Sequence, residues 1–191
     1  MQKKIVLASN SPRRRELLKG LDIDFEIRLI GDIDESYPAD TPPAEVPGFI
    51  AGLKADAYSA TVAENELIIT ADTVVIVDGD ILEKPADRAD AIQMLQRLSG
   101  RKHQVITAVV LMSKDMRKEF SVMSTVDFAE LVNSEIEYYV DKYKPFDKAG
   151  AYGIQEWIGY IGVKGIEGSF YNVMGLPIQR LYQELKTIID K

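Results

Sequence analysis

Hydrophobic and polar residues follow one another along this chain in segments that predict a mixed α/β fold. An apolar run over 3–9 predicts a short buried strand, and alternating positions over 25–29 predict a half-buried one. The segment 67–77 is almost wholly apolar and rich in β-branched residues, which is typical of a central strand. Two more strands are expected over 103–112 and 119–128.

Capping residues predict helices between these strands. Ser11 precedes Pro12, which suits the first helical position because its missing N–H is not needed there, and Gly20 marks the expected end. A later amphipathic helix is expected between Asp87, as its cap, and Gly100. Strands and helices therefore alternate along the chain.

The helix expected to carry Lys54 contains unfavourable residues. It follows an acidic, proline-rich loop, and Pro47, Gly48 and Gly52 lie within it. A glycine inside a helix costs about 1 kcal/mol relative to alanine. We therefore expect this helix to begin late.

The last third of the chain combines helical and strand-like patterns. Ser134 and Glu137 predict a capping box at the start of a helix. The stretches 157–163 and 168–174 are rich in aromatic and β-branched residues and predict strands. A final helix is expected from Pro177.

Length and composition indicate one ordinary globular domain. The chain has 191 residues, of which 46% are hydrophobic and 28% charged, enough to form one buried core. We expect a single domain over 1–191, without a linker or internal repeat. The chain has no cysteine, which excludes disulfides, thiolate metal sites and a cysteine nucleophile.

Charge and hydropathy narrow the range of partners. No apolar run approaches the roughly 20 residues that span a bilayer, so no membrane association is expected. The formal net charge of −7 argues against stable nucleic-acid binding, since duplex-binding surfaces are broadly basic. A small anionic ligand at a local basic site is still compatible with this charge. A cytoplasmic enzyme or binding protein is the simplest interpretation.

The densest positive cluster is formed by Arg13, Arg14 and Arg15, at the start of the first expected helix. Backbone N–H groups and the helix dipole favour anions there, and arginine forks suit phosphate oxygens. Alternatively, all three side chains extend into solvent, as charge runs usually do. The glycine-rich phosphate-loop motifs are absent from the sequence, so a phosphate site here would depend on arginine side chains and helix-end amides.

Asp72 interrupts the apolar segment 67–77. An unpaired carboxylate buried there would cost several kcal/mol or lose its charge, so it needs a cation, a hydrogen-bond network or an exposed position. One interpretation is a local ion pair, for instance with Lys84, which follows a hairpin turn at Asp78–Gly79. The other makes Asp72 a metal ligand or a base for water.

Further carboxylates lie in the first long loop, at Asp32, Asp34 and Glu35. Hard cations such as Mg²⁺ prefer one or two carboxylates together with substrate phosphate oxygens. Acidic loops are usually solvated, so the residues alone leave a role for any of the three open. Lys54 is expected to be exposed on its helix.

Two residues of the second half bear on recognition and on catalysis. Gln155 ends the glycine-punctuated segment 147–155, and its amide has both a donor and an acceptor, enough to read a base edge. Turn geometry alone would also explain Gly150 and Gly153. His103 is the only histidine and is expected to be structural, which disfavours a histidine triad or a His-ligated zinc site.

Six segments of the chain resemble the Maf family of nucleoside triphosphate pyrophosphatases, also described as septum-formation inhibitor-like proteins. They span nearly the whole chain, and their ordered set is highly specific. The segments are LASNSPRRRELL at 7–18, ADTVV at 71–75, ILEKPAD at 81–87, LSGRKHQVITAV at 98–109, DKAGAYGIQ at 147–155 and GSFYNVMGLP at 168–177. The resemblance implies an elongated α/β fold with a mixed, strongly bent sheet and a cleft between two lobes, similar to the inosine triphosphate pyrophosphatase fold.

The resemblance also implies a reaction. It is hydrolysis of a nucleoside triphosphate between the α- and β-phosphates, giving a monophosphate and pyrophosphate, with a divalent cation such as Mg²⁺ or Mn²⁺. The sequence of residues 147–155 is typical of the branch that acts on dTTP and UTP. Both standard and modified pyrimidine nucleotides are left open as physiological substrates. The implied role is housekeeping or linked to division, and a homodimer is suggested.

Particular residues match functional positions of this family. Asp72, in the ADT motif, matches the catalytic carboxylate, and Asp72 and Glu35 match the residues that hold the metal. The residues that match substrate-binding positions are Ser9, Arg13, Arg14, Lys54 and Lys84. The residues that match specificity positions are Arg13, Thr73 and Gln155. The alternative function is a nucleotide-binding regulator of septum formation that acts through a protein partner with little turnover.

Overall fold

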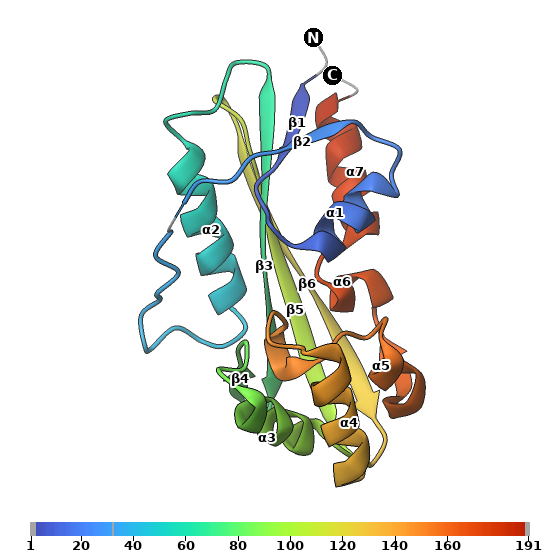
Figure 1. Cartoon of the computed structure of the whole chain (residues 1–191). Helices are drawn as coiled ribbons and strands as arrows, with labels where there is room; N and C mark the ends of the chain where they lie inside the picture. Colours follow the sequence, from blue (N-terminus) through green and yellow to red (C-terminus); the bar gives the residue numbers. More distant parts are fainter. Residues whose placement is uncertain (1–2, 32, 190–191) are drawn as a thin grey trace. The chain divides into compact units, whose positions relative to one another are not determined.

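The computed structural model describes residues 3–31 and 33–189 (Figure 1). Asp32, one of the three loop carboxylates considered above, lies outside these residues. The described elements are, in chain order, β1 (Lys4–Leu7), α1 (Pro12–Lys19), β2 (Phe25–Ile27), α2 (Val46–Tyr58), β3 (Glu66–Val77), β4 (Asp80–Leu82), α3 (Arg88–Leu98), β5 (Lys102–Met112), β6 (Arg117–Phe128), α4 (Asn133–Tyr143), the 3₁₀ turn η1 (Ala149–Ala151), α5 (Trp157–Gly162), β7 (Val163–Glu167), α6 (Phe170–Met174) and α7 (Ile178–Ile189).

The strands of the described residues form one seven-stranded sheet. Its order is β2-β1-β3-β5-β6-β7, and β4 pairs with β3 beside this path. β1 runs parallel to both β2 and β3, whereas the pairs β3–β4 and β6–β7 are antiparallel. The sheet is therefore mixed, which confirms the predicted fold class.

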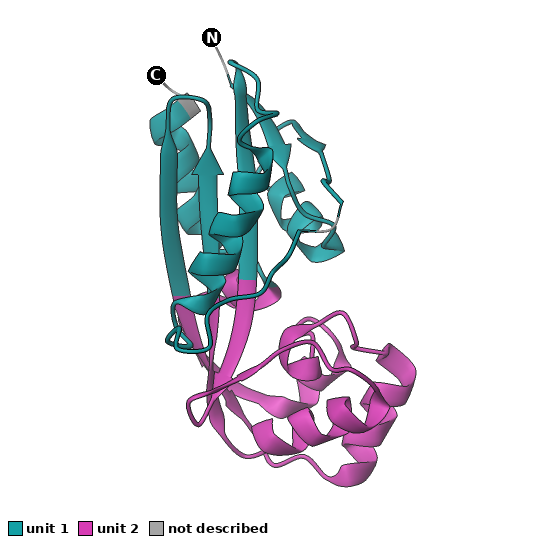
Figure 2. Ribbon diagram, turned by 90° about the vertical axis from the view of Figure 1, so that its left-hand side faces the viewer, with its two compact units in different colours: residues 1–72, 107–122, 175–191 teal, residues 73–106, 123–174 magenta. Residues whose placement is uncertain are grey.

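The chain divides into two compact units (Figure 2). Unit 1 contains residues 1–72, 107–122 and 175–191, and unit 2 contains residues 73–106 and 123–174. The long strands β3, β5 and β6 contribute residues to both units. The single domain over 1–191 and the cleft between two lobes stay predictions.

The core of unit 1 explains why α2 is held firmly. Val6 of β1, Ile68 of β3 and Val110 of β5 share one sheet face and pack against Ala51 and Ala55 of α2. These small helical residues let the helix backbone approach the strands closely. Helices α1 and α7 lie on the other side of the same strands (Figure 1).

The core of unit 2 is formed by helices packed around the strand segments of that unit. Val75 of β3 and Phe128 of β6 are buried together with Leu95 of α3, Tyr139 of α4 and Ile158 of α5. The same cluster contains residues of the 149–154 segment. This segment is therefore part of the core rather than a loose connection.

Helix α2 begins earlier than its composition suggests. It starts at Val46 and has Pro47 in its first turn, where the missing N–H breaks no helical hydrogen bond. The late start predicted for this helix is therefore wrong. A Cβ added at Gly52 would lie 3.1 Å from Arg117 Nη2, so the glycine leaves room for this guanidinium.

Helix α4 is capped two residues earlier than predicted. The Val132 N–H donates to Glu135 Oε2 at 2.9 Å, whereas Ser134 and Glu137 were expected to form the box. The Ser99 hydroxyl accepts from the backbone N–H just before Val132, at 2.7 Å. A tertiary hydrogen bond therefore decides where the chain enters this helix.

The strands predicted over 157–163 and 168–174 are wrong for most of these residues. They form the short helices α5 and α6, and the strand β7 lies between the two. A Cβ added at Gly159 would lie 1.8 Å from the Ile154 carbonyl oxygen. The helical path of α5 therefore depends on a backbone contact that a period-two pattern does not reveal.

His103 has the structural role expected from the sequence. Its ring is buried against Phe128 and Tyr152, with centroid distances of 5.0 and 5.4 Å, and its Nε2 lies 2.7 Å from the Tyr152 hydroxyl oxygen. Burial lowers the pKa of His103 from 6.5 to about 4. The neutral imidazole is therefore the folded form at neutral pH.

This burial predicts a stability that falls as the pH falls from about 6.5 toward 4. In that window the unfolded chain binds a proton at His103 and the folded chain does not, so protonation favours unfolding. We expect the free energy of unfolding to be about 2 kcal/mol lower near pH 4.5 than near pH 7. Urea unfolding at several pH values checks this, and His103→Gln is expected to remove most of the slope. An equal slope in the variant would contradict the assignment.

Candidate active site

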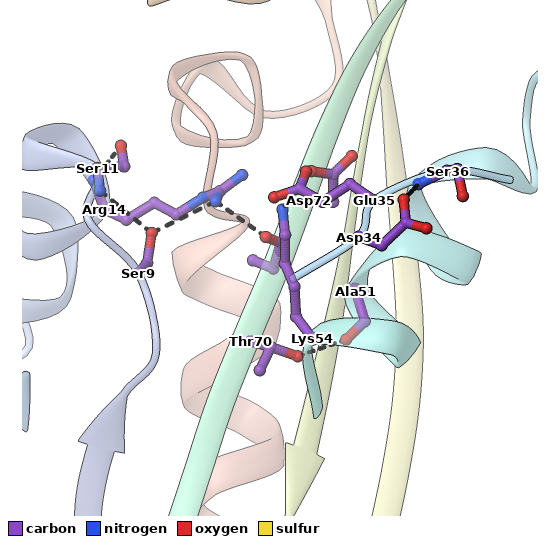
Figure 3. A network of polar contacts seen from close by, with 11 residues as sticks. Ser9, Ser11, Arg14, Asp34, Glu35, Ser36, Ala51, Lys54, Thr70 and Asp72 are labelled. Carbon is purple, nitrogen blue, oxygen red and sulfur yellow. Dashed lines mark hydrogen bonds and ion pairs between the residues drawn. The ribbon is translucent and has the colours of Figure 1, made fainter. Parts of the chain in front are cut away.

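The start of α1 is built around hydroxyl groups and Arg14 (Figure 3). Ser11 caps the helix as predicted, its Oγ accepting from the Arg14 N–H at 3.4 Å. The Arg14 guanidinium donates through Nε to Gly175 O at 2.8 Å and through Nη1 to Ala71 O at 2.9 Å and Ser9 Oγ at 3.4 Å. Arg14 therefore joins the start of α1, strand β3 and the segment before α7.

Burial lowers the pKa of Arg14 from its usual value, while the nearby Asp72 carboxylate opposes that shift. An arginine guanidinium remains charged in proteins, so a positive charge lies beside Asp72. The third arginine of this cluster, Arg15, donates to Asn10 Oδ1 at 2.6 Å, just before the helix. Arg14 and Arg15 therefore form hydrogen bonds to other groups of unit 1. The sequence had suggested either a phosphate site or side chains in solvent, and neither interpretation included these internal contacts.

The carbonyl contacts of Arg14 predict a large effect on stability. Arg14→Met removes charged donors from two carbonyl oxygens, and hydrogen bonds to charged groups contribute about 1.5–3 kcal/mol each. We expect the free energy of unfolding to fall by about 3 kcal/mol, measured by urea unfolding with an unchanged m value. Arg15→Met is the matched control and should cost less than about 1 kcal/mol. Equal losses in both variants would exclude the joining role of Arg14.

Asp72 forms an ion pair with Lys54. Its Nζ lies 2.9 Å from Asp72 Oδ1 and 3.0 Å from Glu35 Oε2 (Figure 3). The side chains of Lys54 and Asp72 are each 15% exposed, so the exposed lysine expected from the sequence is wrong. The pair forms with Lys54, whereas the hairpin position had suggested Lys84.

Strand β3 and helix α2 position this ion pair. The Thr70 hydroxyl of β3 donates to the Ala51 carbonyl of α2 at 2.8 Å, one turn before Lys54. The last turns of α2 are therefore held over the strand position that carries Asp72. This register depends on the small residues of α2 that pack on the sheet.

Of the loop carboxylates that the structure describes, Glu35 faces Lys54 and Asp34 does not. Asp34 Oδ1 accepts from the Ser36 N–H at 2.9 Å. This backbone hydrogen bond lowers the pKa of Asp34 below its usual value. The family resemblance had selected Glu35 as a residue that holds the metal, and that role stays a prediction.

The donor set around Lys54 is suited to a hard divalent cation. Asp72 and Glu35 offer carboxylate oxygens to one point, and Mg²⁺ takes one or two carboxylates, waters and substrate phosphates. Within the described part of the chain, no cluster of three or more acidic, histidine or cysteine residues forms a closed metal cage. The residues therefore fit an open site that substrate phosphates would complete.

Three of the predicted site residues, Thr73, Lys84 and Gln155, belong to unit 2. The segment with Lys84 is tied to the segment with Gln155, because the Gly150 N–H donates to the carbonyl of the residue before Lys84 at 3.1 Å. Gly150 has a φ of 67°, and a Cβ there would lie 3.0 Å from Val75. Both features require glycine at that position.

Sequence reasoning missed a polar cluster around residues 153–156. Tyr139 of α4 and Lys148 both reach Glu156, and the Tyr139 hydroxyl also accepts from the Gly153 N–H. The available signal was Gly153, for which turn geometry was one of the explanations that the sequence left open. A Cβ at this glycine would lie 2.9 Å from the Glu156 carboxyl carbon.

The fold defines a class of α/β protein that solved structures share. The chain is similar to the Ham1 protein of Staphylococcus aureus, with a TM-score of 0.55 and 22% identity, over 95% of this chain and 100% of the other. It is also similar to a HAM1 protein of Coxiella burnetii, with a TM-score of 0.51 and 16% identity, over 99% and 100% of the two chains. The predicted inosine triphosphate pyrophosphatase-like fold class is therefore confirmed.

Sequence comparison assigns the family. The profile described as Maf-like protein matches residues 4–188, and the chain belongs to this family. A Parabacteroides distasonis protein named dTTP/UTP pyrophosphatase is 64% identical over 183 residues, covering 96% of this chain and 95% of its own length. A Bacteroides thetaiotaomicron protein of the same name is 58% identical, again over 96% and 95% of the two chains.

Among the residues that the structure describes, no helix combines the length and the apolar character needed to cross a membrane.

Proposed function

We propose that this chain hydrolyses dTTP and UTP to the monophosphate and pyrophosphate. The observation that carries this proposal is the Lys54 ammonium shared by Asp72 and Glu35, beside the guanidinium of Arg14. Carboxylates and fixed cations in one place suit a polyphosphate and the water that attacks it. The names of the relatives at 64% and 58% identity support the same substrates.

A divalent cation, Mg²⁺ or Mn²⁺, would be held by Asp72 and Glu35. When bound, it supplies charge neutralisation for the phosphates and lowers the pKa of a bound water. Lys54 already lies between these carboxylates and orients them. Its ammonium is also placed to donate to a phosphate oxygen.

The remaining steps use side chains of this chain. Asp72 orients the attacking water toward the α-phosphorus and accepts its proton through an oxygen of the carboxylate. The bond between the α-phosphorus and the bridging oxygen breaks, and pyrophosphate leaves with the bond electrons. Lys54 and the N-terminal amides of α1 stabilise the charge that develops on the leaving group.

The other predicted site residues keep their proposed roles. Ser9 and Arg14 support the phosphate site at the start of α1, where Ser9 Oγ also accepts from the Ser11 N–H at 3.2 Å. Arg13, on the same turn, and Lys84 contact substrate phosphates. Arg13 acts in specificity together with Thr73 and Gln155 of unit 2.

The setting of this activity is also a proposal. We place the enzyme in the cytoplasm, where its nucleotides are found, in a housekeeping or division-linked role. A homodimer is the proposed assembly, without stable nucleic-acid binding. The proposed substrates include modified pyrimidine nucleotides.

The test is pyrophosphate release by the wild-type chain from a panel of nucleoside triphosphates, with Mg²⁺ or Mn²⁺. We expect release from dTTP and UTP that exceeds release from purine nucleotides and disappears when the cation is chelated. Orthophosphate release in place of pyrophosphate would contradict cleavage between the α- and β-phosphates. Tight nucleotide binding without turnover would support the regulator of septum formation instead.

A further inference from the structure

A network of buried polar groups in unit 2 holds the chain on both sides of Gln155. The Tyr139 hydroxyl accepts from the Gly153 N–H at 2.9 Å and donates to the Glu156 carboxylate. Lys148 Nζ lies 3.3 Å from the other Glu156 oxygen. Tyr139 is fully buried and Lys148 is 8% exposed, so solvent competes little for these contacts.

The backbone of 153–156 is folded tightly over this network. The Glu156 N–H donates to the Gly153 carbonyl at 2.9 Å. A Cβ at Gly153 would lie 2.9 Å from the Glu156 carboxyl carbon and 3.1 Å from Lys148 Cε. The glycine therefore allows Glu156 and Lys148 to lie directly against the turn that carries Gln155.

The Tyr139 hydroxyl donates its hydrogen bond in one fixed direction, to the Glu156 carboxylate. Burial and the Glu156 carboxylate raise the pKa of Tyr139, so its hydroxyl remains protonated and donates to that carboxylate. The same oxygen then has a lone pair for the Gly153 N–H. One hydroxyl thus holds the turn at its first and last residues.

The side-chain amide of Gln155 has an oxygen that accepts no hydrogen bond from the described residues. Its Oε1 is buried and finds no hydrogen-bond partner among the described residues. A buried acceptor without a partner is costly, and most such groups in proteins are satisfied. This oxygen is therefore not engaged by another group of the described residues, and it can accept from an N–H of a bound molecule that reaches it.

The orientation of this amide decides which pyrimidine it recognises. Uracil and thymine present an N3–H donor beside the O4 acceptor, whereas cytosine presents an N3 acceptor beside an amino donor. An amide rotated by 180° exchanges its donor and acceptor, so a free glutamine satisfies either pattern. Selection of uracil and thymine over cytosine therefore requires an amide that cannot turn.

We propose that Tyr139, Glu156 and Lys148 are positioning residues that hold Gln155 in the orientation that selects uracil and thymine over cytosine. This inference rests on the proposed function, which assigns Gln155 to the base of the nucleotide. The three residues act through the turn 153–156 and do not touch the substrate.

The test compares UTP with CTP in two measurements for the wild type and Tyr139→Phe. The first is the ratio of kcat/KM values for pyrophosphate release, and the second is the ratio of Kd values for the non-hydrolysable α,β-methylene analogues of UTP and CTP. We expect the preference for uracil to fall about tenfold in Tyr139→Phe, since lost hydrogen bonds of this kind change equilibria by about that factor. Tyr138→Phe is the matched control, because Tyr138 is exposed on the same helix and its hydroxyl only accepts from Lys142 among the contacts described.

Substitutions of Glu156 separate positioning from folding. Glu156→Gln keeps an oxygen that accepts from Tyr139, so it should retain most of the preference for uracil, whereas Glu156→Leu should lose it. A folded Glu156→Leu protein with the wild-type ratio would overturn the inference, as would a Tyr139→Phe protein that changes only its Tm.

The two measurements also separate this inference from the proposed function. A wild-type chain that prefers the UTP analogue without releasing pyrophosphate contradicts the proposed reaction alone, and its Kd ratios still test the positioning residues. A wild-type chain that binds both analogues equally overturns the inference.

Discussion

Asp72→Asn is expected to reduce pyrophosphate release from dTTP and UTP by about 1,000-fold, because the proposed general base is lost and the proposed metal ligand loses its charge. The folded structure should persist. Asparagine has nearly the same shape as aspartate, and its Oδ1 should still accept from Lys54. In the wild type, Lys54 Nζ lies 2.9 Å from Asp72 Oδ1. Initial rates with saturating nucleotide and cation measure the effect, and urea unfolding measures the stability.

Asp56→Asn is the control for this prediction. Asp56 lies one half-turn after Lys54 on the same helix, and its carboxylate pairs with Arg117 at the surface. Exposed ion pairs contribute about 0–1 kcal/mol, so this variant should keep the wild-type rate and nearly the wild-type stability. Substantial pyrophosphate release by Asp72→Asn would rule out its proposed role as the base.

Lys54→Met is expected to reduce kcat/KM by about 100-fold while it strengthens cation binding in the absence of nucleotide. In the proposed reaction the ammonium stabilises the charge on the leaving group, and donors of this kind contribute about 100-fold or more. In the free protein the same ammonium occupies the point between Asp72 and Glu35. Its removal leaves two carboxylates without their cation, and a divalent ion then binds them more tightly.

Calorimetric titration with Mn²⁺ measures this second effect independently of turnover. Lys114→Met is the matched control, because Lys114 forms an exposed ion pair with Glu64 at 2.8 Å. The control should change neither the rate nor the affinity for Mn²⁺. Weaker Mn²⁺ binding by Lys54→Met than by the wild type would show that the two carboxylates do not form the cation site.

The local sequence predicts much of the fold correctly where a single element contains the whole signal. Ser11 caps α1 as predicted, and Asp87 caps α3 by accepting from the Asp90 N–H at 2.9 Å. The apolar, β-branched run of β3 is a buried strand on both sides of Asp72. In each case the physical cause acts between residues that are near one another in the chain.

The failures occur where distant residues decide the local structure. Gly52 lies inside α2 and leaves room for the guanidinium of Arg117, which comes from β6. The entry into α4 is moved by a hydrogen bond that the Leu131 N–H donates to Ser99 Oγ. Intrinsic propensity amounts to about 1 kcal/mol or less per residue, so such contacts override it.

The same division applies to the candidate active site. The sequence alone marks Asp72 as a carboxylate that needs a partner, and it leaves the arginine cluster at α1 open between a phosphate site and side chains in solvent. Only the tertiary structure decides that the partner is Lys54, that Glu35 rather than Asp34 faces it, and that Arg14 donates to two carbonyls. A buried charge demands compensation wherever it lies, whereas the group that compensates it is chosen by the packing of α2 and α1 on the sheet.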